Sequence, residues 1–174
     1  MVSPAPKRQP PNPVRFPADL GRPRDRVVHR RVLFPQDGSI ASLAEYSRWV
    51  RRNPDDPRAY GGRGIAYLNK GDYGRTGRFV SARRQRCFDK AITDLTKAIQ
   101  LAPDDPSLYL WRGIAFRARG QLDKAIGDLT EAIRLEPTAP RAYVERSAAH
   151  QQKGEMNEAE ADNAKADDLA VDLW

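Results

Sequence analysis

Cysteine is almost absent from this 174-residue chain, in which Cys87 is the only one. A single cysteine excludes an intrachain disulfide and metal sites of the paired-cysteine type. The chain also lacks any run of about 18 or more apolar residues, and Met1 to Leu20 has no apolar block of the signal-peptide kind. We therefore expect a soluble, cytoplasmic protein, although a form trimmed of its export signal would have the same sequence.

Motifs that carry chemistry are missing as well. The sequence contains no Gly-rich phosphate loop, no HExxH, no nucleophile elbow and no carboxylate pair placed in a predicted pocket. His150 has no second ligand at a suitable spacing, so we expect it to be a satisfied core residue and no metal or cofactor to be bound. The sequence thus predicts a protein that is not an enzyme.

Charge is distributed unevenly. The formal net charge is +7, but residues 1–40 carry +5, residues 57–87 carry +7 and residues 141–174 carry −4. The N-terminal half of the chain is basic and the C-terminal end is acidic, so an anionic partner is one possible ligand of the basic half.

One stretch, residues 106–139, has the pattern of a complete helix-turn-helix unit. Tyr109, Gly113 and Phe116 recur at i, i+4 and i+7, which is one face of a helix, and Gly120 is suited to end that helix. The second helix stops at Pro137. It places its apolar residues on one side: Leu122, Ala125, Ile126, Leu129, Ala132 and Ile133. Each apolar stripe is too narrow to fold alone, so the unit requires neighbours.

The neighbours are repeats of the same unit. A shift of about 34 residues carries Tyr109 forward to Tyr143, and the same shift carries Leu129 of the second helix back to Leu95. The first helix needs a longer shift, from Gly113 back to Gly64. The excess of about 15 residues over the repeat length indicates an insertion around residues 74–87, where Ser81 to Cys87 could extend the following helix backwards.

The spacing Tyr-x2-Arg-Gly-x2-Phe, followed by Ala-x3-Leu and a closing Pro, resembles the tetratricopeptide repeat. This resemblance implies an all-α, right-handed solenoid of antiparallel helix pairs. Its repeats would span residues 57–105, 106–139 and 140–174, preceded by a capping helix in 39–56 that we expect to begin at Ser39.

Residues 1–38 contain eight prolines among arginines, which predicts a disordered Pro/Arg-rich tail. The segment Val27 to Phe34 is more apolar. It is either a sticky piece of tail or an intramolecular ligand for the groove of the solenoid.

An arginine stands beside the small residue of every first helix, and an aspartate stands three residues after the alanine of every second helix. We predict three ion pairs within repeats: Arg63 with Asp94, Arg112 with Asp128, and Arg146 with Asp162.

The resemblance further implies that the first helices line a concave groove for a partner peptide or helix. The residues mapped to this groove are Arg58, Ile65, Leu68, Asn69, Leu110, Trp111, Ile114, Arg117, Arg141, Val144, Glu145 and Gln151. We expect an apolar floor with arginines at its edge, and open space at Gly61 and Gly62 opposite Trp111. The alternative for Trp111 is that it only packs on neighbouring helices.

Repeat proteins that clamp the acidic tail of heat-shock chaperones use a Lys/Asn/Lys/Arg set in these helices. The matching places here hold Gly61, Ile65, Trp111, Arg141 and Glu145. Only Arg141 fits, so we do not predict that partner.

The insertion supplies a second candidate site. Five arginines, with Phe79, make either a solvated loop or a small site for phosphates or an acidic protein: Arg75, Arg78, Arg83, Arg84 and Arg86. We therefore predict a protein-interaction module of unknown partner, with a binder of nucleic acid or another anionic surface as the alternative. The chain ends in Leu169, Val171, Leu173 and Trp174, which form either a self-association surface or a short cap folded back on the last helix pair.

Overall fold

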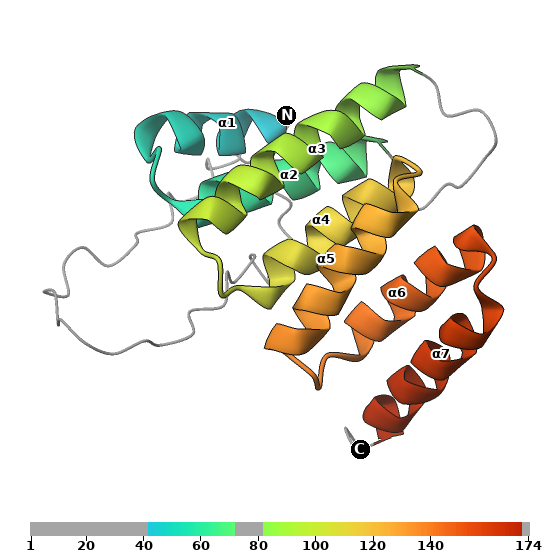
Figure 1. Ribbon diagram of the computed structural model, residues 1–174. Coiled ribbons are helices and arrows are strands. Elements are labelled where there is room, and N and C mark those ends of the chain that lie inside the picture. Colours follow the sequence, from blue (N-terminus) through green and yellow to red (C-terminus); the bar gives the residue numbers. More distant parts are fainter. Residues whose placement is uncertain (1–41, 72–81, 172–174) are drawn as a thin grey trace, which may run out of the picture.

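The computed structural model describes residues 42–71 and 82–171, and every regular element within these ranges is an α-helix (Figure 1). The helices are α1 (Leu43–Arg52), α2 (Pro57–Gly71), α3 (Ala82–Leu101), α4 (Pro106–Ala118), α5 (Leu122–Leu135), α6 (Pro140–Lys153) and α7 (Met156–Val171). They form the antiparallel pairs α2/α3, α4/α5 and α6/α7, which are stacked in chain order. Helix α1 packs against α2 at the N-terminal end of the stack. The predicted all-α solenoid of three repeats is confirmed. The predictions for the tail, for Arg75, Arg78 and Phe79, and for Leu173 and Trp174 lie outside the described residues.

Helix α1 begins later than expected. Ser42 has extended backbone angles and acts as the N-cap: its hydroxyl accepts from the Glu45 N–H at 3.3 Å, and the Glu45 carboxylate accepts from the Ser42 N–H. This capping box starts the helix at Leu43, so the expected start at Ser39 is wrong. Helix α1 covers the first repeat by placing the Tyr46 ring where a Cβ at Gly62 would overlap it. The space expected at Gly62 is therefore filled by α1.

The small residue of each first helix allows its partner helix to approach closely. A Cβ at Gly113 would lie 2.7 Å from Cγ of Leu129, and one at Gly64 would lie 2.8 Å from Cγ of Leu95. Because real Cβ atoms do not come so near, any larger residue at either position would push the two helices apart. In the third repeat Ser147 takes this place, and its hydroxyl donates to the Ala159 carbonyl at 2.9 Å.

The turns of the second and third repeats use glycine in the left-handed region. Gly120 has φ 82° and Gly154 has φ 91°. They let the N–H of the next residue close onto the preceding helix, from Gln121 to Phe116 O at 2.9 Å and from Glu155 to His150 O at 3.0 Å. Gly120 thus ends the first helix, as the sequence predicts.

The insertion lengthens the first repeat on its second-helix side. Helix α3 has 20 residues where α5 has 14, because it begins at Ala82. The predicted backward extension is confirmed from Ala82 to Cys87, and Cys87 itself is buried. Phe88 packs against Gly71, which fixes the end of α2 to the start of the repeated part of α3.

The last helix continues through Val171, because no proline stands where Pro103 and Pro137 end the equivalent stretches. Ile126 and Leu129 of α5 pack in one cluster with Ala149 of the next repeat, and Ile133 stands one turn further along α5. The matching residues of α7 are Glu160, Asn163 and Asp167, all exposed. A polar outer face is typical of a terminal repeat, so it argues against self-association through this part of α7.

Candidate partner-binding face

Each repeat is joined internally by a bidentate Arg–Asp pair, as the sequence predicts. The shortest distances are 2.7 Å from Arg63 Nε to Asp94 Oδ2, 2.7 Å from Arg112 Nε to Asp128 Oδ2, and 2.6 Å from Arg146 Nη2 to Asp162 Oδ1. Two parallel hydrogen bonds in each pair fix the orientation of a first helix on its partner. The hydrogen bond to Asp162 raises the pKa of Arg146 further above its ordinary value, so this arginine stays charged.

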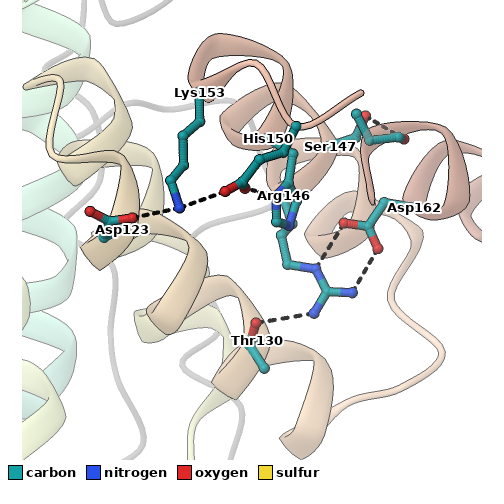
Figure 2. Close-up of polar contacts among 9 residues, drawn as sticks. Asp123, Thr130, Arg146, Ser147, His150, Lys153 and Asp162 are labelled. Atoms are coloured by element: carbon teal, nitrogen blue, oxygen red, sulfur yellow. Dashed lines mark hydrogen bonds and ion pairs between the residues drawn. The ribbon is translucent and has the colours of Figure 1, made fainter. Parts of the chain in front are cut away.

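The second and third arginines also contact the preceding repeat, which the sequence argument missed. Arg112 Nη1 donates to Thr96 Oγ1 at 3.2 Å, and Arg146 Nη1 donates to Thr130 Oγ1 at 3.0 Å, as Figure 2 shows for the second contact. The two threonines occupy equivalent places in successive repeats, so the repeat spacing was the available signal. Each arginine therefore connects three helices.

A tyrosine three residues before each arginine completes this arrangement. The guanidinium carbon lies 5.7 to 5.8 Å from the ring centre in all three pairs, which are Arg63 with Tyr60, Arg112 with Tyr109, and Arg146 with Tyr143. This cation–π contact gives a physical reason for the Tyr-x2-Arg spacing. It uses the arginine-bearing side of each first helix for packing, and the remaining positions line a different face.

On that face, two side-chain contacts join α4 to α6. The Arg141 guanidinium lies over the Trp111 ring at 4.5 Å from its centre, and Arg117 Nη2 donates to Glu145 Oε2 at 2.8 Å. Arg117 and Glu145 are 12% and 14% exposed, so this pair is largely desolvated. The structure thus brings together four of the residues predicted to line the groove.

Two members of the predicted apolar floor are core residues instead. Leu68 and Ile114 are completely buried in the cluster shared by α2, α3 and α4, so they are not accessible to a partner. Trp111 and Leu110 are half-buried and pack against the same cluster. Val144 is 50% exposed, which makes it the most exposed apolar side chain among the predicted groove residues. The accessible apolar surface therefore centres on α4 and α6 rather than on α2.

The other predicted groove residues differ in their exposure and contacts. Ile65 is half-buried, while Asn69 and Gln151 are exposed. Arg58 is engaged at the front of the stack, because its guanidinium pairs with Asp56 at 3.0 Å and lies 5.7 Å from the Trp49 ring centre.

The arginines of the insertion have separate surroundings. Arg84 Nε donates to the Gly71 carbonyl at 2.8 Å, so this side chain holds α3 to the end of α2. Arg83 and Arg86 are exposed.

His150 is paired, as expected of a satisfied residue. Its Nδ1 lies 2.7 Å from Glu155 Oε2, and Lys153 bridges Glu155 at 2.7 Å and Asp123 at 2.8 Å (Figure 2). These contacts join α5, the end of α6 and the turn before α7.

In the part of the chain that the structure describes, no three His, Cys, Asp or Glu side chains form a group that could hold a metal ion. None of the described helices is both long and apolar enough to cross a membrane.

Comparison with known proteins agrees with this architecture. Two family profiles, both described as a tetratricopeptide repeat, match residues 41–75 and 79–150, which together exceed half of the chain. No curated protein matches the chain.

Among solved structures, TTC0263 from Thermus thermophilus, titled a thermophilic TPR protein, is 26% identical with a TM-score of 0.63. The similarity covers 74% of this chain and 68% of TTC0263. MamA MSR-1 is 20% identical with a TM-score of 0.60 over 76% of this chain and 67% of MamA, so the chain spans about two thirds of that protein. The second TPR of Spaghetti (RPAP3), solved with the HSP90 peptide SRMEEVD, is 22% identical with a TM-score of 0.55, over 70% of this chain and 98% of that one.

Proposed function

Because the chain belongs to the tetratricopeptide repeat family, we propose that it is a non-enzymatic interaction module whose first helices bind a peptide or helix of a partner protein. The site is centred on the seam between α4 and α6. Its partner inserts an apolar anchor, and the exposed side chain of Val144 is the observation that carries this proposal.

The position of Val144 follows from its helix neighbours. Residues 141, 144, 145 and 148 share one face of α6, since neighbours three and four apart lie side by side on a helix. Arg141 and Glu145 both contact α4, so Val144 lies on the side of α6 that faces the seam. Covering its exposed half would stabilise a complex by roughly 1 kcal/mol.

The surroundings of Val144 favour an anchor with acidic flanks. The exposed polar side chains of α6 include Arg141, Gln151 and Gln152, which are cationic or neutral. Glu145 is an acid on this face, but it is 14% exposed and paired with Arg117. A carboxylate beside the anchor would therefore meet favourable charge.

The peptide held by the RPAP3 domain is not proposed as a partner here. The places that a heat-shock clamp would use hold Gly61, Ile65, Trp111 and Glu145, with Arg141 alone matching. An apolar anchor, rather than a terminal acidic motif, is what this face suits.

The test is selection of peptides from a displayed random library on the full chain, followed by titration of the selected peptide. Val144→Glu should weaken binding more than tenfold, because it places a charge where the anchor is desolvated. The matched control is Met156→Glu, since Met156 is also a large exposed side chain, at 55%, but belongs to α7. Equal binding by both variants would place the site elsewhere.

A further inference from the structure

The outer face of α3 carries a line of cations that the partner-binding face does not use. Arg83, Arg86, Lys90 and Lys97 are all exposed. They stand at i, i+3, i+7 and i+14, which is one side of a helix, and at 1.5 Å per residue they extend over about 21 Å. We call these four residues the basic stripe.

The repeat pattern accounts for only part of this stripe. Lys90 recurs as Lys124, and Lys97 corresponds to Glu131 of the second repeat and Lys165 of the third. The two arginines, in contrast, precede Phe88, where the repeated part of α3 begins. The arginines are also misplaced for helix stability, because cations near a helix N-terminus oppose its dipole. Among the second helices of the three pairs, α5 and α7 have an acidic residue in the first turn and α3 has none.

Among the described residues, carboxylates do not neutralise the stripe, and Lys90 lies over the Tyr67 ring at 5.3 Å from its centre. Within residues 42–71 and 82–171, no ion pair joins Arg83, Arg86 or Lys97 to a carboxylate. The nearby Asp89 pairs with Arg119 of α4 at 2.8 Å, which brings a further cation to this end of α3. Lys70 adds another, because the bond from Arg84 to Gly71 places the end of α2 beside the start of α3.

From this arrangement we propose that the basic stripe binds the phosphate backbone of a nucleic acid, as an activity separate from peptide binding. A line of exposed cations with no apolar anchor is suited to a sequence-independent polyanion. Stable attachment to a membrane takes an apolar or acyl anchor in addition to charge, and protein interfaces have an apolar core. In the described residues the exposed large hydrophobic side chains are Val144 and Met156, which belong to α6 and α7 and not to α3. At about 3.4 Å per nucleotide, the stripe would follow roughly six nucleotides of a strand.

The test measures binding of the full chain to a fluorescently labelled 20-mer DNA duplex and to the matching single strand, by anisotropy over a range of salt concentrations. The stripe variant is Arg83→Gln, Arg86→Gln, Lys90→Gln. The control variant is Lys124→Gln, Arg134→Gln, Lys165→Gln, which also changes three exposed cations. Each variant lowers the formal net charge from +7 to +4, so the pair separates a local site from an effect of overall charge.

We expect the stripe variant to bind at least about tenfold more weakly near 0.1 M salt, and the control variant to bind like the unaltered chain. Loss of three phosphate contacts should also reduce the slope of log K against log salt by about 2.7 for duplex DNA. Equal weakening in both variants, or no weakening in either, would overturn the proposal. Stripe-dependent binding to anionic phosphatidylserine vesicles without binding to DNA would also overturn it, in favour of a membrane.

Discussion

The ion pair between Arg112 of α4 and Asp128 of α5 tests how much the recurring Arg–Asp pairs stabilise the solenoid. The side chains are 18% and 11% exposed. Replacing Arg112 by Ala leaves a buried carboxylate without donors at 2.7 and 2.8 Å. Breaking a buried pair in this way typically costs about 3 to 5 kcal/mol. Because Asp128 keeps some contact with water, we expect Arg112→Ala to lower the free energy of unfolding by about 3 kcal/mol, the lower end of that range.

The pair of Arg119 and Asp89 provides the control, since it has a similar distance of 2.8 Å but side chains that are 31% and 53% exposed. Arg119→Ala should cost only about 0 to 1 kcal/mol, because an exposed pair exchanges one set of hydrogen bonds for another. The free energy of unfolding of both variants is measured by urea denaturation followed by far-UV circular dichroism.

The double variant Arg112→Met, Asp128→Leu completes the experiment. It removes both charges and leaves apolar side chains, so its stability should return to within about 1 kcal/mol of the unaltered chain. If Arg112→Ala cost no more than Arg119→Ala, the buried pairs would not hold the helix pairs together and the reasoning would be refuted.

Two further predictions concern close packing and burial. Gly113→Ala should destabilise the chain by about 2 kcal/mol, because the new Cβ would meet the Leu129 side chain. Gly127→Ala should instead stabilise it by up to about 1 kcal/mol, because nothing lies within 4 Å of the new Cβ and alanine has the higher helix propensity. Urea denaturation checks both, and a loss for Gly127→Ala as large as for Gly113→Ala would contradict this explanation. Burial raises the pKa of Tyr46, so its stabilising effect is full below the ordinary tyrosine pKa of about 10 and is lost as pH rises through the folded value. Tyr46→Phe should therefore lose less stability than the unaltered chain on going from about pH 9 to pH 11, and an identical loss in both would exclude this cause.

The repeat spacing was enough to predict much of the fold. The apolar periodicity around Gly113 and its recurrence along the chain predicted the helix pairs, and the alignment that they imply placed Arg112 opposite Asp128. Such contacts are predictable because they lie within one helix pair, whose geometry is fixed by close packing at the glycine. The start of α1 was predicted at Ser39 and is wrong, although the Ser42-x2-Glu45 spacing of a capping box was present in the sequence.

The accessible part of the binding face was harder to predict. Leu68 and Ile114 occupy helix positions assigned to the groove, yet both are buried. Whether such a position is open depends on how closely successive helix pairs pack, and residue spacing along one helix does not determine that distance. The contact of Arg141 with Trp111 has the same origin, because it joins two different repeats.

Photo-crosslinking tests the proposed binding face most directly. A benzoylphenylalanine is placed at position 144 in one chain and at position 156 in another, and each chain is irradiated with a peptide selected on the unaltered protein. We predict a covalent adduct from position 144 and none from position 156. An excess of a competing peptide present before irradiation should prevent the adduct at position 144 from forming. An adduct from position 156 alone, or equal adducts from both positions, would contradict binding at the seam between α4 and α6.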